Sequence, residues 1–110
     1  MPTSTEIAQI FPTMCQRFVP EKAEGVNAII QFDLSGDNGG LYWLRIAEGA
    51  CESGEGQADN PKMTLRATAD DYYAVVTGAM NPMQAFMSGK IKIQGDMSLA
   101  MKLQTMFATT

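Results

Sequence analysis

Residues 78–107 read GAMNPMQAFMSGKIKIQGDMSLAMKLQTMF and carry the clearest local structural signals of the chain. Asn81 is a favourable N-cap residue, and Pro82 is a favourable first residue of a helix. Together they predict a short helix over residues 82–88, which Gly89 would end because glycine adopts the conformation that follows a helix most easily.

The second half of this stretch predicts a strand and a closing helix. Lys90, Ile91, Lys92 and Ile93 alternate between charged and apolar side chains, which is the pattern of a strand with one buried face. Asp96 follows a glycine and is expected to cap a helix that extends to about residue 107.

This closing helix is apolar over more of its circumference than the roughly 100° stripe that a surface helix needs. Six of the nine methionines of the chain also lie between Met80 and Met106. Methionine is flexible and polarizable, so it suits both irregular cores and surfaces that accept varied apolar ligands. Either more protein or a ligand is therefore expected to cover this apolar surface.

Length and charge limit the classes of function. A chain of 110 residues is expected to form a single domain (1–110) with a modest core. Its net charge of −4 argues against nucleic-acid binding. Residues 1–61 contain nine acidic and three basic residues, whereas residues 62–110 contain three acidic and five basic ones. The apolar last third is therefore also the more basic part.

The first half of the chain predicts one helix and several strands. Apolar residues at helical spacing from Ile7 to Phe18 predict an initial helix, which Pro12 should kink or break. The pattern then changes to period two, and strands are expected over residues 26–34, 41–47, 50–57 and 62–68. We expect these four strands to form an antiparallel meander, because only short turns separate them.

A helix over residues 71–77, capped by Thr68 or Asp70, completes the expected order of elements. This order, which is one helix, four strands, two helices, one strand and a last helix, predicts an α+β domain with helices on one face of a mostly antiparallel sheet.

Catalytic and metal-binding patterns are missing from the sequence. The chain has no histidine, which excludes Ser-His and Cys-His nucleophiles and the commonest zinc ligand. Asp70 and Asp71 are better explained as first-turn residues of a helix than as a catalytic pair. Cys15 and Cys51 form no CxxC motif and are expected to be two reduced thiols. No enzyme activity and no cofactor are predicted.

Several segments resemble the sterol carrier protein type 2 (non-specific lipid-transfer protein) family. They are FDLSG at 32–36, Trp43 in the return strand, DNPKMT at 59–64, AFMSGKIKIQGD at 85–96 and LAMKL at 99–103. The resemblance covers residues 7 to 107, and the 85–96 segment is its most specific part. It implies a five-stranded sheet, covered by helices, that encloses an apolar tunnel for sterols, fatty acids, acyl-CoA or phospholipids.

Eleven apolar or aromatic residues are candidates to line such a tunnel, although each could also be ordinary core. They are Phe32, Tyr72, Val75, Val76, Met83, Phe86, Met87, Leu99, Leu103, Met106 and Phe107. Trp43 is interpreted instead as an anchor on a sheet face.

We therefore predict a small lipid-binding or lipid-transfer protein with loose specificity. The alternative is a non-enzymatic accessory or dimerisation module, in which the apolar helix packs against a partner or a second copy, for an enzyme that handles lipid or isoprenoid substrates. The absence of a C-terminal Ser-Lys-Leu signal and of a signal peptide predicts a cytoplasmic location and makes sterol a less favoured ligand.

Lys90 and Lys92 have two interpretations. They could contact anionic membrane surfaces during lipid loading, or they could only protect an exposed strand from aggregation.

Overall fold

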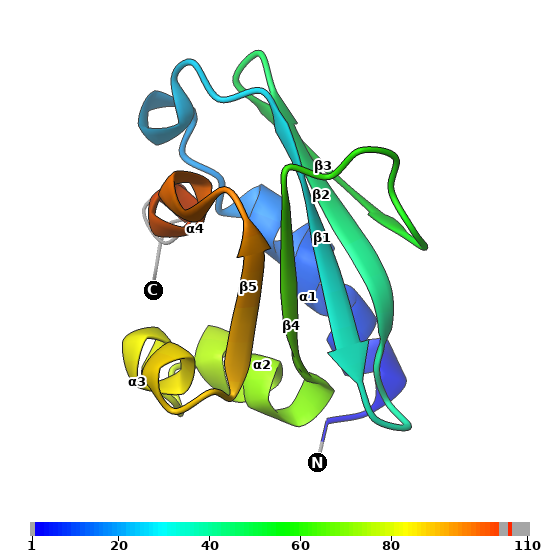
Figure 1. Cartoon of the computed structure of the whole chain (residues 1–110). Helices are drawn as coiled ribbons and strands as arrows, with labels where there is room; N and C mark the ends of the chain where they lie inside the picture. The colour runs from blue at the N-terminus through cyan, green and yellow to red at the C-terminus, as the bar shows by residue number, and fades with distance from the viewer. Residues whose placement is uncertain (1, 104–105, 107–110) are drawn as a thin grey trace.

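The computed structural model describes residues 2–103 and 106, and it confirms the expected order of elements (Figure 1). The helices and strands are α1 (Ser4–Gln16), the 3₁₀ helix η1 (Pro20–Ala23), β1 (Ala28–Ser35), β2 (Gly40–Ala47), β3 (Ala50–Glu55), β4 (Met63–Thr68), α2 (Ala69–Val76), α3 (Pro82–Met87), β5 (Ile91–Gly95) and α4 (Met97–Leu103).

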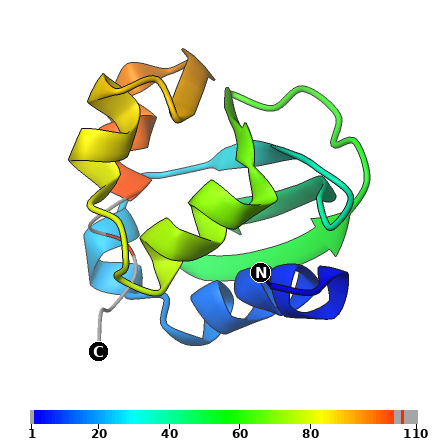
Figure 2. The same cartoon turned by 90° about the horizontal axis from the view of Figure 1, so that it is seen from below.

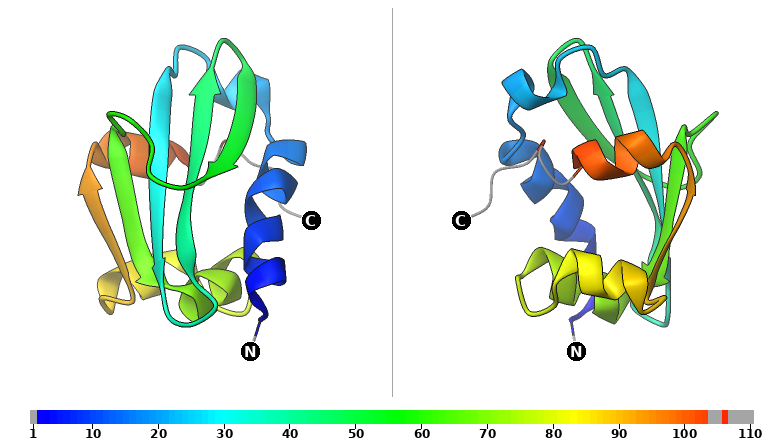
Figure 3. Two further views of the ribbon diagram at one scale, coloured as in Figure 1. Left: turned by 90° about the vertical axis from the view of Figure 1, so that its right-hand side faces the viewer. Right: turned by 60° about the vertical axis from the view of Figure 1, so that its left-hand side comes forward.

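The five strands form one mixed sheet in the order β3-β2-β1-β4-β5. The pairs β1–β2, β2–β3 and β4–β5 are antiparallel, whereas β1 and β4 are parallel. The predicted four-stranded meander is therefore wrong at its last step. Residues 56–62 do not form a tight turn but cross the sheet, and they bring β4 beside β1 (Figure 3, left).

Burial explains this crossover. Met63, Leu65 and Ala67 of β4 are all buried, whereas β3 is a short polar strand without a fully buried residue. β4 lies next to the central apolar strand β1, where its apolar residues are buried, and β3 is left at the edge of the sheet.

A buried glutamine fixes the crossing segment to the sheet. The Gln31 side chain is buried on the face that the helices leave open, here called the open face. Its Nε2 donates to the carbonyl oxygens of Tyr42 at 2.9 Å and Gly56 at 3.1 Å. Its Oε1 accepts the Ala58 N–H at 2.7 Å. All polar groups of this side chain are thus paired, which buried amides require.

The helices cover the other face of the sheet, and the core lies between the two layers (Figures 2 and 3). Side-chain caps define where most of these helices begin. Thr3 and Glu6 form a reciprocal capping box at α1, and Thr68, Asn81 and Asp96 accept backbone N–H groups at α2, α3 and α4. The predicted caps Asn81, Thr68 and Asp96 are confirmed.

Two helices differ in extent from the prediction. α1 is a single helix from Ser4 to Gln16 that continues through Pro12, whose side chain is exposed. The described part of α4 spans Met97–Leu103. The predicted extension to about residue 107 is wrong at Met106, which lies in a bend, and residues 104, 105 and 107 lie outside the described residues. Among the described residues, no helix has the length and hydropathy that crossing a membrane requires.

The prediction of two reduced thiols is also wrong, because Cys15 and Cys51 form a disulfide. α1 lies beside the edge strand β3, and this packing brings the two Cα atoms to 5.3 Å although 36 residues separate them in sequence. Only tertiary structure creates this proximity. Disulfides persist mainly in oxidising compartments, so the cysteines no longer support the predicted cytoplasmic location.

Candidate functional site

Four aromatic rings fill the interior beneath α1 and α2. Phe11 of α1 stacks on Tyr42 with ring centroids 4.6 Å apart, and it contacts Phe32 at 4.9 Å and Tyr72 at 6.1 Å. Phe32 and Tyr72 are 5.5 Å apart. Such ring pairs each add about 0.5–1.5 kcal/mol beyond the burial of their area. This part of the interior is therefore densely packed core.

One polar group lies within this aromatic cluster. The Tyr72 hydroxyl donates a hydrogen bond to the Met14 sulfur at 3.6 Å, and burial raises the pKa of that hydroxyl. A thioether is a weak acceptor, so this hydroxyl stays protonated and only weakly bound.

Another part of the interior is closed by α4 and Met106. Leu99 and Ala100 are buried, and Met106 is completely buried. The Val19 N–H donates to the Met106 carbonyl at 2.7 Å, which joins Met106 to the segment between α1 and η1.

Other apolar side chains of α2, β5 and α4 are only half-buried. Val75 and Val76 end α2, Met80 follows in the loop to α3, Ile93 lies on β5 and Leu103 ends α4; all of them pack against the core without being enclosed by it. α2 and α3 contact each other near the start of β5, whereas α4 packs against β4 and β5 near the other end of that strand (Figure 1).

The predicted lining residues therefore fall into three groups. Phe32, Tyr72, Leu99 and Met106 are buried; Val75, Val76 and Leu103 are half-buried; Met83, Phe86 and Met87 are exposed. Phe107 lies outside the described residues. The tunnel and its lining remain predictions.

Sequence reasoning did not include Phe11 or Tyr42 among the site candidates. Helical spacing in α1 and the period-two pattern of β2 mark both as inward-facing, and these signals could have added them to the lining.

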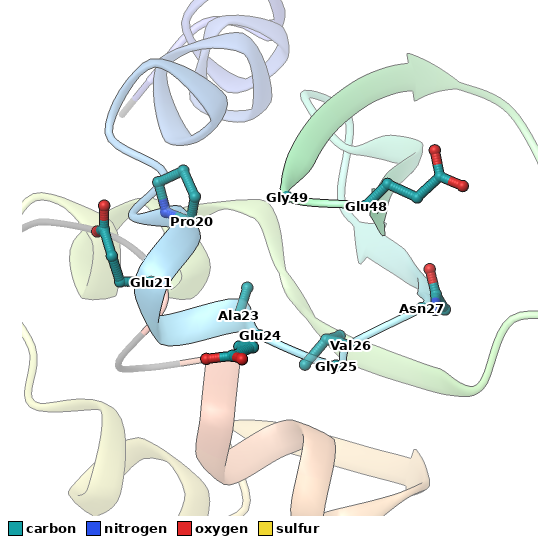
Figure 4. A pocket seen from close by; sticks show the side chains of 9 residues that line it. All are labelled: Pro20, Glu21, Ala23, Glu24, Gly25, Val26, Asn27, Glu48 and Gly49. Carbon is teal, nitrogen blue, oxygen red and sulfur yellow. The ribbon is translucent and has the colours of Figure 1, made fainter.

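Two hollows at the surface lie away from these residues. One, of about 450 Å³, is formed by η1, the segment 24–27 that precedes β1, and the β2–β3 turn (Figure 4). It contains Glu21, Glu24 and Glu48 and none of the predicted lining residues. A second, of about 320 Å³, adjoins it around Asn27 and Glu48. Among the described residues, no group of three or more acidic or cysteine side chains could hold a metal ion.

The sequence model of the SCP-2 sterol transfer family matches residues 9–108. The chain belongs to this family. It is 33% identical over 104 residues to human hydroxysteroid dehydrogenase-like protein 2, and the match covers 94% of this chain but 25% of that protein. The chain thus spans about a quarter of the length of the curated relatives that it matches.

Solved structures of the family have the same fold. The solution structure of sterol carrier protein domain 2 of Helicoverpa armigera is 30% identical, with a TM-score of 0.71, and the match covers 92% of this chain and 81% of that one. Palmitated SCP2L2 from Aedes aegypti has a TM-score of 0.75 at 20% identity, with 90% and 88% covered. Family membership indicates that this is a lipid-binding domain.

Proposed function

We propose that this domain binds the acyl chain of a lipid between the sheet and the helices, and that it transfers lipids with loose specificity. Family membership supports lipid binding, and palmitate accompanies the related Aedes aegypti protein. The observation that supports this placement is that Val75 and Val76 of α2, Ile93 of β5 and Leu103 of α4 pack against the core while staying only half-buried.

The acyl chain would lie against Val75, Val76, Ile93 and Leu103 rather than replace the aromatic rings. These side chains are only partly enclosed, so less packing is lost when a ligand displaces them. Burying a CH₂ group contributes about 0.8 kcal/mol, so a sixteen-carbon chain could gain on the order of 10 kcal/mol before the costs of ordering. Few polar groups adjoin this region, which accounts for the loose specificity.

A filling substitution tests this placement. Val76→Phe adds volume where the ligand would lie and should weaken binding at least tenfold, measured by displacement of a fluorescent fatty acid with palmitate. Leu41→Phe, on the open face, is the matched control and should bind like the parent. Overpacking costs about 1–3 kcal/mol, so thermal unfolding is measured beside binding.

Two results would contradict the proposal. If palmitate displaces no probe from the parent at micromolar concentration, the chain is not a fatty acyl carrier. If Val76→Phe is folded and binds as tightly as the parent, the ligand does not lie against α2.

The second candidate function is an accessory module of a lipid-handling enzyme. It is favoured by one observation, that the chain matches a quarter of human hydroxysteroid dehydrogenase-like protein 2. In this role the domain would present lipid to a separate catalytic domain, or would pair with a partner through its apolar helices.

A further inference from the structure

α3 buries its smallest side chain and exposes its largest ones. Ala85 is 1% exposed, whereas Met83, Phe86 and Met87 are 59%, 40% and 82% exposed. An ordinary surface helix does the reverse and turns its large apolar residues toward the core. Three large apolar side chains on a six-residue helix have no intramolecular reason to face solvent, and such surfaces commonly mark interaction sites.

The charged residues that flank α3 in the sequence are of one sign. Residues 72–95 contain no acidic side chain, and their charged residues are Lys90 and Lys92. Residues 1–71 contain eleven acidic and five basic residues, a net charge of −6, so the surroundings of α3 differ from most of the chain. The Lys90 N–H donates to the Ala85 carbonyl at 2.9 Å, which holds the backbone of Lys90 against the C-terminal end of α3.

The position of the two lysines follows from the sheet. Ile91 is buried under the helices, so Lys92 points to the open face, where it lies opposite Arg66 across the β4–β5 pair. β5 is an edge strand, and α3 packs against it (Figure 3, right). Arg66 is ion-paired with Asp33 (Nε to Oδ2, 3.7 Å). The positive charges that this sheet edge offers beside the exposed apolar helix are therefore Lys90, between α3 and β5, and Lys92, on the open face of β5.

We propose that α3 docks this domain on lipid surfaces with anionic headgroups. Met83, Phe86 and Met87 enter the boundary between headgroups and acyl chains, and Lys90 and Lys92 contact the headgroups. An apolar helix face buries about 5–10 Å into this boundary, and each nearby lysine adds about 1 kcal/mol of attraction. This inference rests on the proposed lipid-carrying function in one respect: docking would serve to load lipid from the membrane and release lipid to it.

A second copy of the chain fits this face less well. In a two-fold interface the same surface meets itself. Such a dimer would bring Lys90 and Lys92 of both copies together, while residues 72–95 offer no carboxylate to neutralise them. Anionic lipid supplies the missing negative charge.

The test is flotation with vesicles of phosphatidylcholine, alone or mixed with phosphatidylglycerol. The parent should float with the mixed vesicles and bind neutral vesicles several-fold more weakly. Replacing two exposed methionines together (Met83→Ser with Met87→Ser) should reduce binding at least tenfold, because burying each such side chain is strongly favourable. Leu41→Ser, an exposed apolar residue on the open face, is the matched control and should bind like the parent.

A lysine variant separates the electrostatic part. Replacing both lysines (Lys90→Gln with Lys92→Gln) should weaken binding to the mixed vesicles by about tenfold or more at low salt. The difference should shrink at high ionic strength because salt screens exposed charges. Thermal unfolding shows that each variant is folded, and Met87→Gln alone replaces the double methionine variant if that one unfolds.

Several outcomes would overturn the docking proposal. One is a methionine variant that is folded and floats like the parent. Another is a parent protein that does not float with the mixed vesicles. A third is a parent that sediments as a dimer while the double methionine variant sediments as a monomer, because α3 would then join two copies of the chain. Fatty acid displacement needs no vesicle, so it distinguishes failure of docking from failure of the carrier function. A parent that floats but displaces no fatty acid would still support docking.

Discussion

α1 and α3 are opposite in construction. α1 is thirteen residues long, begins with a capping box, buries Ile7, Ile10 and Phe11, and is bonded covalently to β3 through Cys15. α3 is six residues long and buries one alanine. This comparison shows that α1 contributes much more of the buried core than α3. Under the proposed function, α3 would make surface contacts at little cost in stability.

The largest expected contrast lies between two side-chain deletions. Phe11→Ala removes the ring that contacts three other aromatic rings, and it should lower the free energy of unfolding by about 3–5 kcal/mol. Met87→Ala, at the exposed end of α3, should change that free energy by less than about 0.5 kcal/mol. Denaturant unfolding of both variants measures the contrast, and equal losses would show that α3 is part of the rigid core.

The disulfide should have the next largest effect. The disulfide links residues that are 36 positions apart in the sequence. Replacing both cysteines with serine should therefore lower the free energy of unfolding by about 2–4 kcal/mol. The melting temperature of the parent should fall on reduction to that of the double serine variant. If reduction leaves the melting temperature unchanged, the link between α1 and β3 does not stabilise the fold.

A cap substitution should have a smaller and more local effect. The Asn81 side chain accepts the N–H groups of Met83 at 2.8 Å and Gln84 at 3.3 Å. Asn81→Ala should cost about 1 kcal/mol, and faster amide hydrogen exchange should be confined to α3 and its neighbours. Spread of the faster exchange to α1 would contradict the separation of the two regions.

The smallest expected effect depends on pH. The Thr3 backbone N–H and the Tyr73 hydroxyl both donate to Glu6 and hold the pKa of its carboxyl below the ordinary 4.5. Because this pKa is lowered on folding, the stabilisation is present above the unfolded pKa and is lost as pH falls through the folded one. The melting-temperature difference between the parent and Glu6→Gln should therefore be present at neutral pH and vanish in acid. A difference that persists in acid would contradict this origin.

Local sequence signals predicted most helices and strands, whereas contacts between distant segments were not predicted. Asn81, Thr68 and Asp96 cap helices through atoms two or three residues away, so sequence alone locates them. The parallel pairing of β1 with β4 and the Cys15–Cys51 bond depend on contacts between distant segments. No short-range pattern specifies such contacts.

The sequence predicted the residue types of the candidate site but not how deeply each side chain is buried. Met106 and Met87 are the same residue type in the same apolar third of the chain, yet one is completely buried and the other largely exposed. The difference arises because the Met106 carbonyl accepts the Val19 N–H in the interior, whereas α3 packs through Ala85. Periodicity in a six-residue helix is too short to reveal this orientation.

Native mass spectrometry of the purified chain, without added lipid, tests the central claim most directly. A lipid carrier should retain co-purified lipid, so the account predicts a monomer with the added mass of one acyl lipid, lost on mild activation in the gas phase. A lipid-free dimer that does not take up palmitate would contradict it and would favour the accessory or dimerisation module.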